Sequence, residues 1–222
     1  MPRIQHAFRA ARAGLVALSF ALAACVAAPK PDSPELTNFA YKELTAGRTG
    51  AALTHAEARL KVEPRDANAV LVRGMALNRL GRHAAAATTF EDYIARGGNN
   101  RGVVVEYAWS LLGIGEVDDA AALLEGYLRV DPNSSPGQLL LGEAYLAKDN
   151  LAKAEPSLKH ALADKALRPR ALFGLVALEA SRGNGEAMLK HAIDLLENEP
   201  RSPEALAMAE ILRPALEDAR KQ

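Results

Sequence analysis

The sequence predicts an all-α solenoid, a row of helical hairpins that stack on one another, and three observations carry this prediction. Alanine is the commonest residue and only 5% of residues are aromatic, which favours helices because alanine has the highest helix propensity. Glycines recur at multiples of 34 residues, at Gly47, Gly81, Gly115 and Gly183. Prolines recur at twice that step, at Pro64, Pro132 and Pro200. A fixed period of this length is typical of repeat architectures.

The register divides residues 33–202 into five copies of 34 residues without insertion or deletion, with Asp149 at the one step that lacks glycine. The copies are 33–66, 67–100, 101–134, 135–168 and 169–202. Each is predicted to be one helical hairpin that breaks at its glycine. A column of small residues five positions after the break lets the two helices approach closely; it holds Ala52, Ala86, Ala120 and Ala154. Residues 203–222 are predicted as a last helix that caps the open end of the core.

Among the five copies, the third shows the helical pattern most clearly. Val104, Tyr107, Ala108 and Leu111 share one face of a first helix. Serine–proline pairs mark three helix starts, because a hydroxyl caps the N-terminus and proline suits the first helical position: Ser33-Pro34, Ser135-Pro136 and Ser202-Pro203. Between the second and third copies, Gly97-Gly98-Asn99-Asn100 replaces the proline turn and predicts a soft joint.

These residues resemble the tetratricopeptide repeat (TPR) family over about three quarters of the chain. The matching motifs are Gly74-Met75-Ala76-Leu77 with Gly81, Ala86 and Phe90; Gly142-Glu143-Ala144-Tyr145 with Ala154; and the link Asp131-Pro132-Asn133. The resemblance implies a right-handed superhelix of five TPR hairpins. It also implies a concave face, lined by the first helices, that holds a peptide or a helix of a partner protein.

The first 24 residues have the features of a secretory signal peptide. Three arginines precede an uncharged stretch, Ala13 to Ala24, that is too short to span a bilayer, which takes about 20 residues. The stretch ends in Leu22-Ala23-Ala24-Cys25, which resembles the lipobox of bacterial lipoprotein precursors. This resemblance implies a lipidated Cys25 as the mature N-terminus and, because Val26 rather than aspartate follows, an outer-membrane location facing the periplasm. Residues 25–32 then form a short tether; the alternative is an ordinary signal peptide with a chance cysteine.

Composition and spacing argue against several other functions. Lys+Arg 27 against Asp+Glu 27 gives no excess of positive charge for nucleic acid binding. Cys25 is the only cysteine, and no two histidines have the i, i+4 spacing of a metal site on a helix. No Gly-x-Ser-x-Gly motif is present. The sequence therefore predicts no enzyme, no cofactor or metal, and no small-molecule substrate.

The resemblance places a candidate peptide-binding groove on the first helices. Its predicted residues are Tyr41, Leu71, Met75, Asn78, Arg79, Val105, Trp109, Leu139, Glu143 and Phe173. Most are apolar, so we expect an extended segment or an amphipathic helix of a partner, with Trp109 as anchor, because tryptophan is enriched among binding hot spots. The alternative is that Trp109 and Met75 only fill the space between neighbouring hairpins.

Together these features predict a non-enzymatic, lipid-anchored scaffold that binds protein. Small TPR lipoproteins resemble two functional groups. One assists the assembly of pili and secretins (the Tad-type and type IV pilotin-like lipoproteins), and the other consists of adaptors that recruit peptidoglycan enzymes. A third alternative is a structural lipoprotein that associates with itself.

Overall fold

The computed structural model describes residues 28–219, and every regular element in this part of the chain is an α-helix. The helices are α2 (Glu35–Thr45), α3 (Thr49–Val62), α4 (Ala67–Arg79), α5 (His83–Ala95), α6 (Arg101–Ile114), α7 (Val117–Leu128), α8 (Ser135–Ala147), α9 (Leu151–Ala161), α10 (Arg168–Ser181), α11 (Gly185–Asn198) and α12 (Pro203–Ala219). The predicted all-α solenoid is therefore confirmed. The predicted signal peptide, Cys25 and the first residues of the tether lie outside the described residues.

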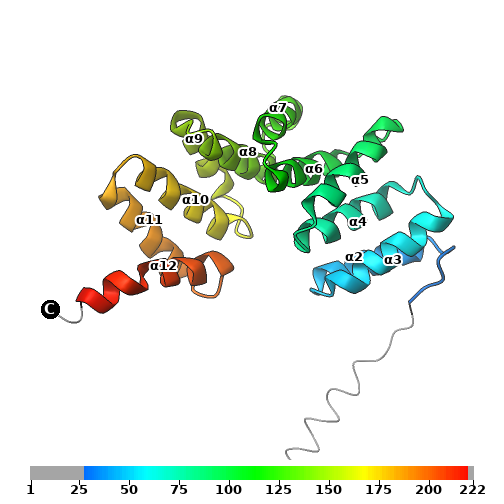
Figure 1. The fold of residues 1–222 in the computed structure, drawn as a ribbon, viewed down its shortest axis with the longest axis horizontal. Helices are drawn as coiled ribbons and strands as arrows, with labels where there is room; N and C mark the ends of the chain where they lie inside the picture. Colours follow the sequence, from blue (N-terminus) through cyan, green and yellow to red (C-terminus); the bar gives the residue numbers. More distant parts are fainter. Residues whose placement is uncertain (1–27, 220–222) are drawn as a thin grey trace, which may run out of the picture.

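Consecutive helices pair into hairpins that stack side by side into a curved solenoid (Figure 1). The arrangement from α2–α3 to α10–α11 is consistent with five repeats, and α12 packs on both α10 and α11. In the arch that the hairpins form, α6, α8 and α10 lie on the inner side, while α7, α9 and α11 lie outside them (Figure 1).

The turn inside each hairpin explains the 34-residue glycine column. Gly47, Gly81, Gly115 and Gly183 all have positive φ, between 70° and 86°, where only glycine avoids a steric penalty. Asp149 takes the fifth place with φ 55°, and aspartate is among the few other residues that tolerate this conformation. The register found in the sequence is thus a register of left-handed turns.

Close approach of the two helices in a hairpin depends on the small column. Ala52, Ala86, Ala120 and Ala154 are all completely buried, as the sequence predicts. Larger side chains four positions later fill the space beside them: Phe90, Leu124 and Leu158. The core runs through the stack as three apolar clusters, centred on the first two hairpins, on the third to fifth, and on the α10–α12 end.

The predicted helix starts are right in one case and displaced in two. Ser202 caps α12 as expected, its Oγ accepting a hydrogen bond from the backbone N–H of Ala205. In α8 the cap is Ser134 rather than Ser135, because the chain turns one residue earlier and Ser134 Oγ accepts from the N–H of Gly137. At α2, Ser33 Oγ accepts from the N–H of Glu35, but Pro34 precedes the helix instead of starting it.

Candidate functional site

The first helices of the hairpins, α2, α4, α6, α8 and α10, carry all ten residues of the predicted groove. Five of them are half-buried and pack against the core clusters: Leu71, Met75, Val105, Trp109 and Phe173. Tyr41 and Arg79 are exposed, and Arg79 donates a hydrogen bond of 2.8 Å from Nη1 to the carbonyl oxygen of Leu44. Arg79 thereby ties α4 to the C-terminal end of α2.

Two predicted groove residues are buried and need correction. Leu139 is only 1% exposed and belongs to the central apolar cluster, so it forms part of the core. Asn78 is only 2% exposed and its side chain is occupied by the neighbouring hairpin. Leu139 shares its register column with Leu71, Val105 and Phe173, so the repeat spacing does not distinguish a buried member of this column from a half-buried one.

Asn78 is the centre of a polar network that joins α4 to α6. Its amide Nδ2 donates to the backbone oxygen of Glu106 at 3.0 Å and to the Glu106 carboxylate at 3.2 Å. Its Oδ1 accepts from Ser110 Oγ at 2.9 Å and lies 3.2 Å from His83 Nδ1. Because buried polar groups are costly unless they are paired, this network fixes the spacing of the second and third hairpins.

Glu106 is the electrostatically unusual member of this network. Burial raises the pKa of its carboxyl, against the lowering effects of the Asn78 hydrogen bond and the positive charges of Arg79 and Arg170. The folded protein therefore holds the Glu106 proton more tightly than the unfolded chain does. It follows that this group's contribution to the free energy of unfolding falls as the pH rises from its ordinary pKa through its raised value.

Trp109 lies in a second array that crosses four hairpins, from α5 to α10. The guanidinium of Arg170 stands over the indole, 5.6 Å from the ring centroid, and the His83 ring lies 6.4 Å away on the other hairpin. Arg170 is held there by Glu143, with two hydrogen bonds of 2.6 Å, Nε to Oε1 and Nη2 to Oε2. The indole thus fits both interpretations of the sequence: it packs between hairpins and keeps part of its surface open.

An open cavity of about 490 Å³ lies next to this array, between α8, α10 and α12. Two of the ten predicted residues, Glu143 and Phe173, line it. The rest of its wall comes from Leu146, Arg170, Gly174, Ala177, Pro203, Glu204 and Ala207. The volume falls within the range of about 300–1,000 Å³ typical of ligand pockets. Its lining is largely apolar, with Arg170, Glu143 and Glu204 as polar groups.

Glu106, Arg170 and the contribution of α12 are not among the features that the sequence predicted. Glu106 had a detectable signal, because it is the one charged residue in a column of the 34-residue register that otherwise holds Asn38, Val72, Leu140 and Gly174. Arg170 had no such signal, because its column has no common character from which a charged residue would stand out. The other copies have Asn68, Gly102 and Pro136 there, among others. The part played by α12 depends on how the last helix folds back, which no spacing within the repeats specifies.

Residues 28–219 contain neither a cluster suited to a metal ion nor a helix suited to cross a membrane. This part of the chain contains no group of three or more His, Cys, Asp or Glu side chains placed to hold a metal ion. None of its helices combines the length and the hydrophobicity that crossing a bilayer requires.

Two family models, both described as tetratricopeptide repeat, match residues 37–101 and 111–179, together more than half of the chain. None of the curated proteins is similar enough in sequence to match.

Solved structures show the same fold. The thermophilic TPR protein TTC0263 of Thermus thermophilus is 25% identical, with a TM-score of 0.69 over 80% of this chain and 97% of that one. MamA (residues 41-end) of Desulfovibrio magneticus RS-1 is 21% identical, with a TM-score of 0.60 over 76% and 95% of the two chains. YrrB, described as a TPR protein with an unusual peptide-binding site, is 17% identical, with a TM-score of 0.57 over 82% and 93%.

Proposed function

Because the chain belongs to the tetratricopeptide repeat proteins, we propose that it is a non-enzymatic scaffold whose concave face binds a segment of a partner protein. The observation that carries this proposal is the cavity between α8, α10 and α12, which has an apolar wall beside the Trp109–Arg170–Glu143 array. An apolar side chain of a partner would enter the cavity, and the paired charges beside it would select the polar groups next to that side chain.

The lipobox-like end of the signal peptide extends this proposal to location. A lipidated Cys25 would hold the scaffold on the periplasmic side of the outer membrane, with the described tether residues leading directly into α2. The tether contacts the first hairpin, because Arg59 Nη1 donates to the carbonyl oxygen of Asp32 at 3.1 Å. We propose that the anchored scaffold assists the assembly of an envelope complex such as a pilus or a secretin.

Filling the cavity tests the binding face without removing core contacts. Ala177 is exposed and lines the cavity, so Ala177→Trp places a bulky ring in it. We expect partner capture by the lipidated protein in a membrane pull-down to fall at least tenfold, with the helical circular dichroism unchanged. The matched control is Ala152→Trp, an exposed alanine on α9 that does not line the cavity. Equal capture by both variants would show that the cavity is not the binding surface.

The same pull-down separates the candidate pathways. A secretin or pilus component lost only from the Ala177→Trp sample supports the assembly role. A peptidoglycan enzyme lost in the same way would replace it with the adaptor role. If the only species lost is a second, tagged copy of this chain, the protein associates with itself.

The anchor is tested separately by Cys25→Ser. We expect most of the protein to move from the membrane fraction to the soluble periplasmic fraction, because stable anchoring takes more than one acyl chain and the variant has none. Fractionation with intact-mass measurement gives the answer, since the lipidated form lacks residues 1–24 and carries the mass of its acyl chains. Wild type that is soluble and unacylated, like the variant, would identify an ordinary signal peptide.

A further inference from the structure

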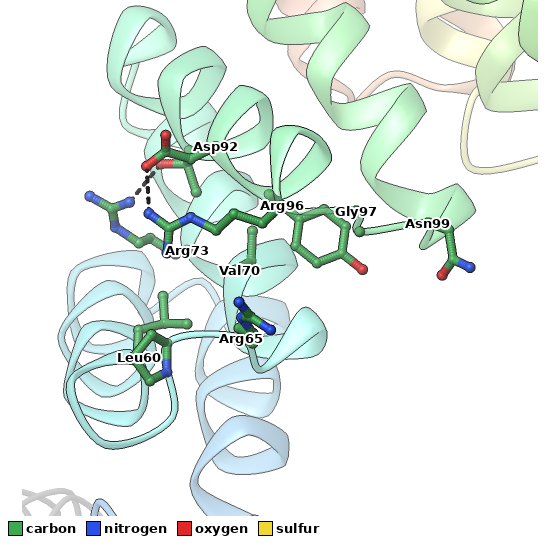
Figure 2. Close-up of a pocket in the computed structure, with 12 residues that line it drawn as sticks. Leu60, Arg65, Val70, Arg73, Asp92, Arg96, Gly97 and Asn99 are labelled. Atoms are coloured by element: carbon green, nitrogen blue, oxygen red, sulfur yellow. Dashed lines mark hydrogen bonds and ion pairs between the residues drawn. The ribbon is translucent and has the colours of Figure 1, made fainter.

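A second cavity, of about 430 Å³, lies between the second helices of the first two hairpins, α3 and α5, and over α4 (Figure 2). None of the ten predicted groove residues lines it. Its wall includes the apolar groups of Leu60, Val70 and Tyr93, and three arginines enter it from three different segments. We call this cavity the arginine pocket: Arg65 comes from the α3–α4 turn, Arg73 from α4 and Arg96 from the end of α5.

The arginines keep most of their donors available. Arg73 Nη1 donates to Thr89 Oγ1 at 2.7 Å, and its Nε is 3.6 Å from Glu57. Arg96 Nη2 donates to Asp92 at 3.3 Å, but the Asp92 side chain is 67% exposed and the pair is correspondingly weak. Within residues 28–219, Arg65 forms no hydrogen bond or ion pair. Since each guanidinium has five N–H groups, unspent donors remain around the pocket.

The arginine pocket can be compared with the other junctions between hairpins in the same chain. The 34-residue register gives the residues that occupy the equivalent positions at each of them. Equivalent hollows recur at the next two junctions, one lined by Val104, Leu123, Tyr127 and Val130, the next by Leu128, Gln138, Leu141 and Ser157. Repeat packing alone therefore creates the hollow. The residues that replace Arg65, Arg73 and Arg96 at the three later junctions are Asn99, Tyr107 and Val130; Asn133, Leu141 and Asp164; and Leu167, Leu175 and Asn198. Three arginines therefore line this hollow, whereas the two equivalent hollows have one lining arginine each, Arg101 and Arg129.

The segment predicted as a soft joint forms one wall of the pocket. Gly97 has φ 83°, and a Cβ on Gly98 would lie 2.3 Å from the Tyr93 ring, so only glycine lets that ring pack against the backbone there. The hydroxyl of Tyr93 accepts a hydrogen bond from the N–H of Asn100 at 3.3 Å. The glycine pair thus allows the aromatic wall to form at the segment predicted as a soft joint.

We propose that the arginine pocket binds a carboxylate joined to an apolar group, as at the C-terminal residue of a peptide. Guanidinium forks match carboxylates with paired hydrogen bonds, and the wall of Leu60, Val70 and Tyr93 covers the attached apolar group. A bare phosphate or a lipid headgroup would use the arginines but leave that wall in water. Asp92 and Glu57 also disfavour a dianion more than a monoanion, because each contributes a negative charge beside the arginines.

The test uses the full chain in detergent and ligand-detected NMR, with N-acetyl-phenylalanine as the probe. We expect saturable binding that is at least tenfold weaker for N-acetyl-phenylalaninamide, which differs only in lacking the carboxylate. Arg65→Gln should weaken binding of the acid by about tenfold or more, because a charge-assisted pair is lost. Its melting temperature should stay unchanged, because Arg65 is exposed. The matched control is Arg101→Gln, which removes an exposed arginine from the equivalent hollow and should leave binding intact.

Further probes identify the source of the carboxylate. Tighter binding of acetyl-Gly-Gly-Phe with a free C-terminus indicates a peptide, and equal binding indicates a small organic acid. The proposal is overturned if acid and amide bind alike or not at all, or if Arg65→Gln has no effect. It is also overturned if inorganic phosphate or phosphatidylglycerol vesicles bind in an Arg65-dependent way more tightly than the carboxylate probes.

Discussion

Phe90→Ala is expected to lower the free energy of unfolding by about 3–5 kcal/mol, the range measured when large buried aromatic side chains are truncated. The Phe90 ring on α5 is completely buried and fills the space above Gly74 on α4, with the Tyr107 ring of the next hairpin 6.3 Å away. One side chain thus joins three helices, and its loss leaves a cavity that rigid helices close only in part. Urea denaturation followed by circular dichroism measures the loss.

Gly74 supplies the other half of this contact, and its substitution tests the packing from the opposite side. A Cβ at this position would lie 1.9 Å from Cζ of Phe90, and the enclosed ring has nowhere to move. Gly74→Ala alone is therefore expected to cost about 1–3 kcal/mol, as overpacking does. In the Phe90→Ala background, Gly74→Ala should instead raise the free energy of unfolding, because the new methyl group fills part of the cavity and alanine favours the helix.

The control for this cycle is Gly50→Ala on α3, where an added Cβ meets no atom within 4 Å. Helix propensity alone should make it stabilising by roughly 0.5–1 kcal/mol. If the losses of stability caused by Phe90→Ala and Gly74→Ala simply add in the double variant, the contact between the two residues is contradicted. Additive losses are expected of independent sites, whereas residues in contact are coupled.

The fold could be predicted from sequence because its determinants repeat. A left-handed turn requires glycine or a tolerant residue every 34 positions, and a close helix pair requires alanine five positions later. Each requirement appears in several copies, so a chance occurrence of glycine or alanine in one copy does not mislead the prediction. The same repetition allowed Asp149 to be recognised as a turn residue, and its φ of 55° confirms that interpretation.

The candidate sites were harder to predict because they depend on departures from the repeat. Leu139 and Asn78 occupy first-helix positions like their neighbours, and only the three-dimensional packing shows that they face the adjacent hairpin. The pair Glu143–Arg170 forms between separate hairpins, where no local rule operates. The arginine pocket was missed for a different reason. Its three residues stand in three different columns, and each column has to be compared along the chain before its arginine stands out.

Asn78→Asp is expected to destabilise the protein by about 3–5 kcal/mol at pH 7, because it buries a second carboxylate beside that of Glu106. The new carboxylate would replace the amide that donates to the Glu106 carboxylate at 3.2 Å, so two like charges would meet where one hydrogen bond existed. Ser110 would still donate to it, and His83 would too with its proton on Nδ1, but these donors do not offset the loss of solvation and the repulsion from Glu106 at a position that is 2% exposed.

The pH dependence distinguishes this mechanism from a simple packing defect. Burial already raises the pKa of Glu106, and a second carboxylate would raise the pair's proton affinity further. The folded variant then binds more protons than its unfolded chain, so its deficit relative to wild type should shrink as the pH falls toward 4.5, the ordinary pKa of glutamate. Denaturation curves between pH 4.5 and 8 give the slope; a packing defect would give a deficit that does not change with pH.

A second substitution should rescue the first if the charges are responsible. Glu106→Gln in the Asn78→Asp background restores a donor opposite the new carboxylate and should recover most of the lost stability, because the hydrogen bond reforms with its direction reversed. Asn68→Asp provides the matched control, since Asn68 is exposed in the first turn of α4, where a negative charge is neutral or slightly favourable. If Glu106→Gln fails to rescue, the coupling between α4 and α6 resides in Ser110 and His83, and the Asn78–Glu106 contact contributes little to the spacing of these hairpins.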